Sequence, residues 1–203
     1  MKYLMTPSHE VVNSEFISCL RAIHPVPEEA LAIIHQKSSY LFVKKGKFIR
    51  SALDKEEKIY FIVKGCVRGF VKDDGMEITT WITNENNIVG SIRNLGCDVY
   101  TEEYLQVLED SQLIQICRRD IEDMYESFPE ANIIARKILE IHYRDAEERA
   151  FLSRLPSAQK RYNRFVLTRP ELVGRVPIKY IASYLGMKLE TLCRIRTKNL
   201  HTL

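Results

Sequence analysis

The sequence has little of what marks a membrane-spanning or disordered protein. It contains only 8 glycines and 7 prolines in 203 residues, and the longest stretch without Asp, Glu, Lys or Arg covers only Tyr180–Met187. A transmembrane helix needs about 20 predominantly apolar residues, so none is expected. The N-terminal residues MKYLMTPSHE also lack the apolar segment of a secretory signal. We therefore expect a globular protein of the cytoplasm without a membrane partner.

Cysteine pairs are lacking as well. The five cysteines are an odd number, and no two of them stand in a C-x-x-C arrangement. Neither a disulfide framework nor a metal site such as a zinc centre is therefore predicted. We interpret them as reduced thiols that pack as small apolar side chains. They are Cys19, Cys66, Cys97, Cys117 and Cys193.

Residues that carry enzyme chemistry are also missing. No histidine lies between His35 and His142, so a metal-dependent enzyme of the cupin type would have no histidine ligands in this segment. The G-x-S-x-G, H-E-x-x-H, Walker A and G-x-G-x-x-G motifs are absent. We can name no catalytic residue and expect that the protein is not an enzyme.

Positive charge is concentrated at the end of the chain. The net charge is +3, but the 48 residues from Pro156 onward hold ten Lys and Arg against two acidic residues, Glu171 and Glu190. This segment carries +8, while the residues before it carry −5 from 20 basic and 25 acidic side chains. Clustered basic charge indicates a polyanion such as DNA as a partner, with a solvated basic surface as the alternative.

Residues 40–117 carry the pattern of short β-strands. Runs rich in β-branched and aromatic residues occur at 40–43, 47–49, 59–63, 67–71, 78–82, 88–89, 104–108 and 113–116. The turn signal Asp73-Asp74-Gly75 predicts a tight hairpin, because glycine accepts a positive φ. Eight short strands with regular turns favour a jelly roll or barrel over a parallel sheet.

Helices are predicted on both sides of this β-rich segment. Two short amphipathic helices, separated by Pro25-Val26-Pro27, are expected within residues 9–37. From Pro129 to Leu155 there is no further proline or glycine, which predicts a helix over residues 129–155, about 40 Å long. Such a helix often mediates dimerisation, and packing on its own barrel is the alternative. The apolar positions expected in the dimer helix are Ile134, Ile138, Ile141 and Leu152.

The segment Ile178–Thr197, IKYIASYLGMKLETLCRIRT, has the pattern of a helix-turn-helix. Apolar residues recur along it, with Ala182 in the first half and Gly186 at the centre. A small alanine lets two helices cross closely, and glycine accepts the left-handed backbone of the turn. We predict a first helix from about Ile178 to Leu185 and a second from about Leu189 to Thr197.

The outward face of the second helix carries side chains suited to reading base edges. An arginine forks onto guanine O6 and N7, a glutamate accepts from cytosine N4, and an apolar side chain touches the thymine methyl. Phosphate contacts position a protein without reading sequence. The predicted DNA base contacts are Lys188, Leu189, Glu190, Cys193, Arg194 and Thr197, and the predicted backbone contacts are Lys179, Tyr180, Ser183, Thr191, Arg196 and Lys198.

The order of these parts resembles that of Crp/Fnr-family transcription regulators, in particular their short, divergent members. The resemblance is carried by Arg175-Val176-Pro177, Tyr180–Gly186 and Glu190–Arg196 near the end, and by Tyr60–Arg68 and Leu108–Ser111 in the β-rich segment. It covers nearly the whole chain. The C-terminal motif is specific, whereas each of the others is weak alone.

The resemblance implies a homodimer joined along the long helices, with two recognition helices in successive major grooves of a palindromic site on double-stranded DNA. It also implies an unknown small-molecule effector and RNA polymerase as a partner. The expected fold is α+β: a double-stranded β-helix (jelly-roll) effector domain over 1–128, the dimerisation helix over 129–155 and an all-α helix-turn-helix domain over 156–203.

The effector-binding stretch departs from that of the family's cyclic-AMP binders. Those members hold the ligand with a Gly-Glu pair and a later arginine, whereas here Ser91 follows Gly90 and no such arginine arrives. Acidic residues near that position would repel a phosphate. We therefore expect no cyclic-AMP cofactor and place the effector pocket at Gly90, Ser91, Arg93, Glu102 and Glu103.

Three further departures limit the comparison. Cys19 is the only cysteine of the N-terminal region, so an iron-sulfur cluster lacks ligands, while haem stays open because it needs one axial His or Cys. Residues 169–177 are too short and too rich in proline to provide a β-hairpin wing. Lys188 and Leu189 stand where the best-known members have a capping Ser or Thr and a base-reading Arg, so a different target sequence is expected.

The sequence thus predicts a dimeric, sequence-specific DNA-binding regulator. The alternative is a sensor or scaffold whose roll binds a small molecule or protein and whose basic tail lacks specific DNA recognition. Substitution of Arg194 or Lys198 separates the two, because loss of a base contact relaxes sequence preference and loss of a phosphate contact weakens all DNA binding.

Overall fold

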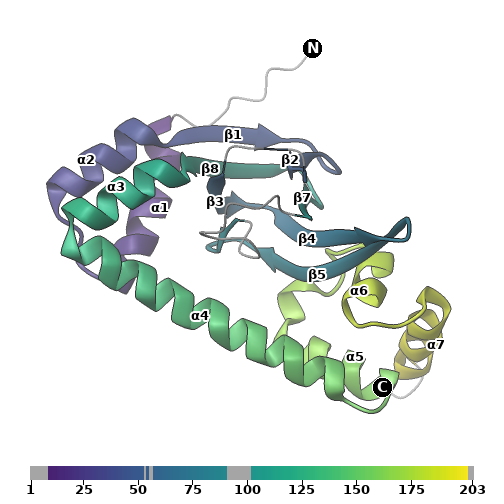
Figure 1. The fold of residues 1–203 in the computed structure, drawn as a ribbon. Helices are drawn as coiled ribbons and strands as arrows, with labels where there is room; N and C mark the ends of the chain where they lie inside the picture. The colour runs from purple at the N-terminus through teal and green to yellow at the C-terminus, as the bar shows by residue number, and fades with distance from the viewer. Residues whose placement is uncertain (1–8, 53, 55–56, 91–101, 201–203) are drawn as a thin grey trace.

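A roll of antiparallel strands forms the centre of the molecule in a computed structural model, which describes residues 9–52, 54, 57–90 and 102–200 (Figure 1). One sheet has the strand order β1-β8-β3-β6 and the other the order β2-β7-β4-β5. The predicted β-rich segment is confirmed, strand by strand. The strands are β1 (Ser39–Val43), β2 (Phe48–Arg50), β3 (Lys58–Lys64), β4 (Cys66–Asp73), β5 (Met76–Asn84), β6 (Ile88–Val89), β7 (Glu103–Val107) and β8 (Ser111–Cys117).

Side chains of β3 alternate between the inside and the outside of the roll, as the twofold period of a strand requires. Tyr60 and Ile62 point inward and pack with Leu105 and Leu113 between the two sheets. Phe61, between them, points outward into a second apolar core. The roll is therefore apolar on both faces of this strand.

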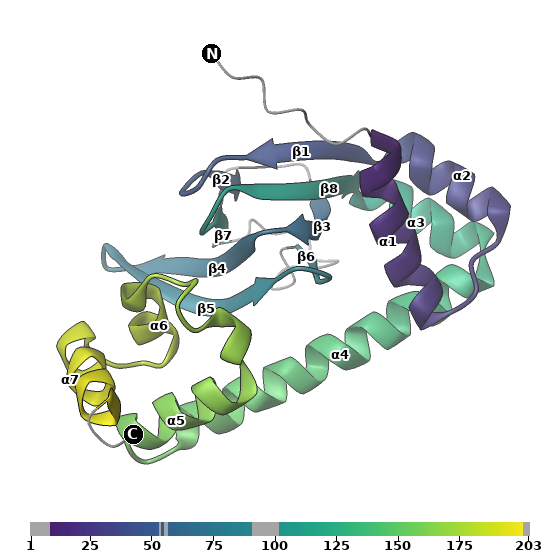
Figure 2. The ribbon, with the colours of Figure 1, turned by 180° about the vertical axis from the view of Figure 1, so that it is seen from behind.

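Three helices cover the outer face of the β1-β8-β3-β6 sheet (Figure 2). These are α1 (His9–Ile23), α2 (Glu28–Lys37) and α3 (Arg118–Ser127), joined there by the first part of α4 (Pro129–Arg154). The first two helices and the long helix were predicted, whereas α3 was not. Phe16 of α1 packs against Phe61, with ring centroids 4.9 Å apart.

The hairpin between β4 and β5 has the predicted tight turn. Asp74 and Gly75 both have positive φ, 45° and 78°, and Asp73 pairs with Met76. Two central residues of positive φ form the type I′ turn that fits the twist of a two-residue hairpin. This prediction is confirmed.

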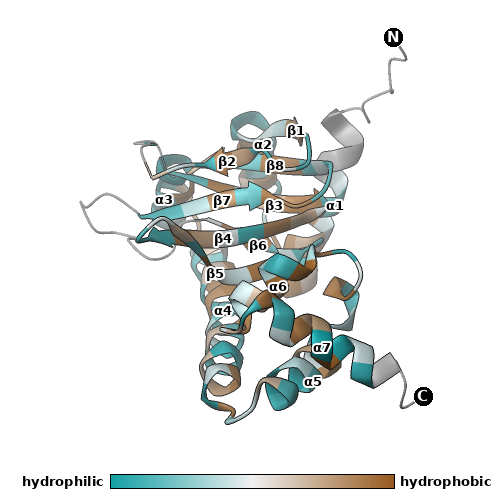
Figure 3. Ribbon diagram, turned by 90° about the vertical axis from the view of Figure 1, so that its right-hand side faces the viewer, coloured by the Kyte–Doolittle hydropathy of each residue, from teal (hydrophilic) through white to brown (hydrophobic). Residues whose placement is uncertain are grey.

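The C-terminal helices follow α4 and return to the roll. They are α5 (Ala158–Thr168), a 3-10 helix (Pro170–Leu172), α6 (Ile178–Tyr184) and α7 (Leu189–Leu200). The side chain of Ser157 caps α5 by accepting a hydrogen bond from the backbone N–H of Lys160. In Figure 3, α6 lies between β5 and α7. None of the helices in the described ranges is long and apolar enough to cross a bilayer.

Candidate nucleic-acid interface

The α6–α7 pair is held in shape by the turn between its helices. Gly186 has a φ of +60°, its N–H donates to Ser183 O, and Met187 N–H donates to Ala182 O at 3.0 Å. These two bonds form the Schellman motif that ends a helix at a left-handed residue. Ala182 is buried where the two helices meet. Both residue types have the roles that the sequence pattern indicates.

Helix α7 has one buried and one exposed face. Leu192 and Ile195 are buried against α5 and α6, which fixes the rotation of the helix about its axis. The opposite face is exposed and includes the uncompensated cation Arg194, which forms no ion pair with any described residue. The six predicted base contacts all lie at exposed positions: Lys188, Leu189, Glu190, Cys193, Arg194 and Thr197.

The predicted backbone contacts fall into two groups. Lys179, Arg196 and Lys198 are exposed. Tyr180 and Ser183 of α6 are half-buried and contact the roll of the same chain. Thr191 is half-buried near the start of α7. The predicted DNA contacts thus all lie on the α6–α7 segment. Two of their side chains, those of Tyr180 and Ser183, already contact the roll of the same chain.

Ser183 connects α6 to the β4–β5 hairpin through both hydrogen-bonding roles of its hydroxyl. Oγ accepts from the backbone N–H of Thr79 at 2.9 Å and donates to the carbonyl of Glu77 at 3.0 Å. Both partners lie on β5, which is therefore the strand on which α6 rests.

Arg68 of β4 is the buried centre of the same contact. Its guanidinium carbon lies 3.7 Å from the ring centroid of Tyr180 and 4.1 Å from that of Phe70. The guanidinium is buried between these rings and is hydrogen-bonded on its other sides. These bonds matter because a buried charge without partners is costly. Nε donates to Gln106 at 2.8 Å, Nη1 donates to Thr79 at 3.2 Å, and Nη2 pairs with Glu77.

Arg175, just before α6, forms the second polar link to the roll. Its two terminal nitrogens donate to the two carboxylate oxygens of Glu85 at 2.9 and 2.7 Å, and Nη2 also pairs with Glu109. Hydrogen bonds from Arg175 lower the pKa of Glu85 to about 2, and the two carboxylates raise the pKa of Arg175 above its usual range. Arg169 adds a bond from Nη2 to the carbonyl of Ile82 at 3.2 Å.

One apolar core continues from the roll into the C-terminal helices. Burial there raises the pKa of the Cys66 thiol to about 12, so this cysteine is a neutral packing residue. The core joins Cys66, Ile82 and Leu108 of the roll with Leu152 of α4, Phe165 of α5, Ile181 of α6 and Leu192 of α7.

The structure corrects the expected dimer seam on α4. Ile134 is buried against α1 and the roll, and Leu152 is buried among the C-terminal helices, so neither faces away from its own chain. Ile138 also packs partly on the first of these cores, while Ile141 is exposed. The reason is that α4 packs along its own roll and helices, the alternative that the sequence left open.

The other side of α4 carries an exposed apolar strip. Leu139, Tyr143 and Phe151 are 53, 66 and 51% exposed. At 3.6 residues per turn, positions four and eight residues apart stay within about a third of the helix circumference. These three side chains therefore form one strip along the helix, away from the buried side.

Only Gly90, Glu102 and Glu103 of the predicted effector residues lie within the described part of the chain. Ser91 and Arg93 lie outside the described residues. Gly90 follows β6 beside Ile59, whereas Glu103 of β7 is buried and accepts a hydrogen bond from Trp81 Nε1 at 2.8 Å. Glu102 is exposed. The described neighbours of Gly90 and of Glu103 are therefore different residues.

Sequence reasoning missed the residues that attach α6 to the roll. The sequence places Arg68 in a family motif and Glu85 in a turn, and it indicates no contact with the C-terminal helices for Arg68, Glu77 or Glu85. The one local signal was a charged residue inside an apolar strand, Val67-Arg68-Gly69-Phe70. Gly69 has its own explanation, because a Cβ there would lie 2.2 Å from Trp81.

Comparison with known proteins identifies the central part of the chain. Residues 40–128 match the family described as the cyclic nucleotide-binding domain. No curated protein sequence matches the chain.

Solved structures of similar fold cover a larger share of the chain. A putative transcriptional regulator of the Crp/Fnr family from Eubacterium rectale has 18% identity and a TM-score of 0.70, covering 87% of this chain and 85% of that one. A CooA mutant from Carboxydothermus hydrogenoformans has 14% identity and a TM-score of 0.68, covering 84% and 79%. FixK2 from Bradyrhizobium japonicum has 21% identity and a TM-score of 0.66, covering 81% and 85%. At these identities the likeness concerns the fold.

Proposed function

The chain contains a cyclic nucleotide-binding domain and its structural neighbours are Crp/Fnr-family transcription regulators; from this premise we propose that it is a homodimeric, sequence-specific DNA-binding transcription regulator. In this proposal α6 and α7 are the helix-turn-helix and α7 is the recognition helix. RNA polymerase is its partner in transcription.

The observation that carries the proposal is the division of α7 into two faces. Leu192 and Ile195 hold the helix on α5 and α6, so the face with Arg194 and Glu190 is directed away from the core. An exposed helix of this kind fits the major groove, where arginine and glutamate side chains discriminate guanine and cytosine. The basic charge of the last 48 residues supports the same partner.

The homodimer is proposed through the exposed strip of Leu139, Tyr143 and Phe151 on α4. Three large apolar side chains on one side of a 26-residue helix are costly in water and fit a second copy of the same helix. Two-fold symmetry would then place two α7 helices for half-sites about 34–36 Å apart.

The effector of the roll is proposed to be something other than cyclic AMP. Ser91 stands where the cyclic-AMP binders have a glutamate, and the acidic pair Glu102-Glu103 follows where they have an arginine. A phosphate would meet negative charge there instead of a charge-assisted hydrogen bond.

Selection from a random duplex library by the purified protein tests the proposal. At about 0.15 M salt, we expect a two-fold symmetric motif with half-sites about one helical turn apart. Arg194→Gln is expected to change the base preferred at one position of each half-site and to cost about 1–3 kcal/mol of binding free energy.

Arg196→Gln is the matched control on the same helix. As a phosphate contact it should weaken binding to all duplexes alike and reduce the salt slope by about 1. If neither substitution changes binding to any duplex, the regulator proposal fails and the sensor or scaffold is the better description.

A further inference from the structure

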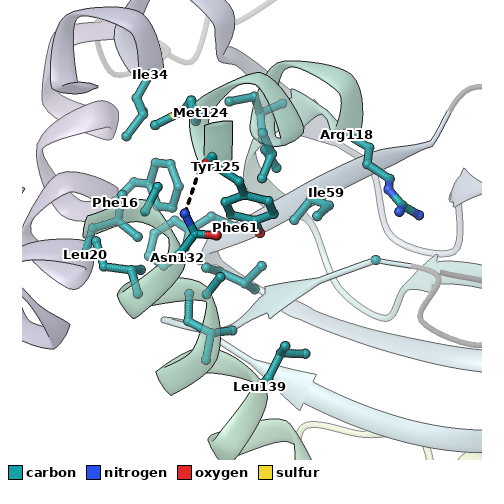
Figure 4. Close-up of a pocket in the computed structure, with 18 of the residues that line it drawn as sticks. Phe16, Leu20, Ile34, Ile59, Phe61, Arg118, Met124, Tyr125, Asn132 and Leu139 are labelled. Carbon is teal, nitrogen blue, oxygen red and sulfur yellow. Dashed lines mark hydrogen bonds between the residues drawn. The ribbon is translucent and has the colours of Figure 1, made fainter. Parts of the chain in front are cut away.

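A cavity of about 490 Å³ lies between the outer face of the β1-β8-β3-β6 sheet and the helices that cover it (Figure 4). Its lining residues come from α1, α2, α3, α4, β3, β6 and β8, and they include Arg50 of β2 and Gly90. Ligand sites in proteins have volumes of about 300–1,000 Å³, so this space suits a small molecule.

The wall of the cavity is almost entirely apolar. Figure 4 shows Phe16 and Leu20 of α1 facing Phe61 of β3, with Met124 of α3 above them. Asn132, a polar residue in this part, already donates from Nδ2 to the carbonyl of Tyr125 at 2.7 Å. The body of a ligand here must therefore be apolar.

Arg50 is the exception in this wall. Only 5% of its surface is exposed, and its Nε has no hydrogen-bond acceptor among the residues that the structure describes. Arginine is charged at every physiological pH, and a buried charge without a counter-charge is strongly unfavourable.

The other cations at the margin of the cavity have partners. Arg118 donates to Glu57 at 2.6 Å and pairs with Glu122 as well. Arg136 pairs with Glu140 on the same helix, and Lys58 also has a partner. Arg50, in contrast, forms no ion pair with any described residue. The positive charge that a ligand would meet is therefore that of Arg50.

We propose that this cavity binds an amphipathic carboxylate, a small molecule with an apolar body and a single carboxylate group that pairs with Arg50. A guanidinium binds a carboxylate through two parallel N–H···O bonds, which here would come from the two terminal nitrogens of Arg50, because its Nε is fully buried. A straight-chain fatty acid is the simplest molecule of this class. A cationic or neutral ligand of the same shape would leave the buried charge uncompensated.

Ligand binding in this cavity does not depend on the proposed function. Only the role of the ligand as an effector rests on it. If the protein is a regulator, this ligand class is its effector, because α4 lines the cavity and also packs on the C-terminal helices. Binding itself is measured without DNA. Failure of the ligand experiment therefore leaves the DNA selection untouched, and the reverse also holds.

Calorimetric titration of the full chain with decanoate and with decanol, which differ in the charged group, tests the proposal. Decanoate is expected to bind at least about tenfold more tightly than decanol, with a negative heat-capacity change from the buried chain. Arg50→Gln should reduce decanoate binding to the level of decanol, and Arg50→Lys should retain part of the preference. Thermal melting of each variant establishes that it is folded.

Arg136→Gln is the matched control, since Arg136 also borders the cavity but already pairs with Glu140. It should leave the preference unchanged. Equal affinity for decanoate and decanol, an unchanged preference in Arg50→Gln, or binding only at micelle-forming concentrations overturns the proposal. Sedimentation of the same samples tests one further outcome that would overturn the proposal. If decanoate binds only when a dimer dissociates, a second copy of the chain covers the cavity.

Discussion

At the scale of single residues, Arg68 and Arg175 attach the C-terminal helices to the roll. Each reaches carboxylates that are distant in sequence, Glu77 for the first and Glu85 with Glu109 for the second. Their partners could not be predicted, because a pairing between distant segments leaves no local pattern. The exposed face of α7 could be predicted, because the alternation of apolar and polar residues depends only on the helix period.

Arg175→Gln is expected to destabilise the protein by about 1–3 kcal/mol, because hydrogen bonds to charged groups stabilise more than neutral ones and two carboxylates lose their partner. Thermal unfolding measures this change. Arg136→Gln removes the exposed pair with Glu140 and should change stability by less than about 0.5 kcal/mol. Equal effects of the two substitutions would contradict the role given to Arg175.

Low pH should weaken the contact between Arg175 and Glu85. The pKa of Glu85 is lowered from 4.5 to about 2 in the folded protein, so the unfolded chain binds a proton first as pH falls. The stability that this carboxylate contributes is complete above its unfolded pKa and is lost as pH falls toward 2. Melting temperatures measured through this range should fall more steeply for the natural protein than for Glu85→Gln. Parallel curves would show that Glu85 is not linked to folding.

At the scale of elements, the strands and most helices follow from local pattern, and the exception has a physical reason. Helix α3, Arg118–Ser127, has only three large apolar residues, Ile121, Met124 and Tyr125, and no side chain caps its start. Its helical form depends on packing against β8 and α4. Local propensity is a weak guide to such a segment.

The turn between β3 and β4 depends on Gly65. Its φ is +122°, and a Cβ there would lie 2.1 Å from Ser111 Oγ and 3.0 Å from Ser111 Cα. Gly65→Ala should therefore cost about 2–4 kcal/mol from strain and overlap together. Gly46→Ala, at a φ of +82° with open space around the Cβ, should cost about 1 kcal/mol. Chemical denaturation compares the two, and a smaller loss at Gly65 would contradict this account.

The exposed strip of α4 gives a second test at this scale. Tyr143→Glu places a charge among Leu139 and Phe151 and should weaken the proposed dimer at least about tenfold, since an unpaired charge is costly at an apolar interface. Analytical ultracentrifugation measures the dissociation constant. Arg119→Glu, at an exposed position of α3 away from this strip, is the control. A dimer unaffected by Tyr143→Glu would place the interface elsewhere.

At the scale of the whole molecule, α6 packs on β5 and occupies two of the residues predicted to contact DNA. Tyr180 lies on Arg68, and both hydrogen-bonding roles of Ser183 are used by β5. No sequence pattern indicated this contact, because the motif of a helix-turn-helix specifies how its helices pack on each other and not where the pair rests. For the same reason the two-sided packing of α4 was left open.

Ser183→Ala should loosen this contact without unfolding the chain. The backbone N–H of Thr79 loses its acceptor, so its hydrogen exchange should accelerate by about tenfold, equivalent to about 1.4 kcal/mol. Thr197→Ala, which removes a hydroxyl that bonds only within α7, should leave the exchange of Thr79 unchanged. Identical exchange in Ser183→Ala and the natural protein would mean that the hydroxyl does not protect this strand.

The apolar core that runs from Cys66 and Ile82 to Leu192 bears on how such a chain evolves. Proteins diversify by recombining domains, and a domain is transferred to another protein most easily when few contacts cross its boundary. Here the boundary crosses a shared interior, so a grafted copy of the last 48 residues would lose its packing against Cys66, Ile82, Leu108 and Leu152. The roll and the C-terminal helices of this molecule must therefore change together, by compensating substitutions on both sides of one interior.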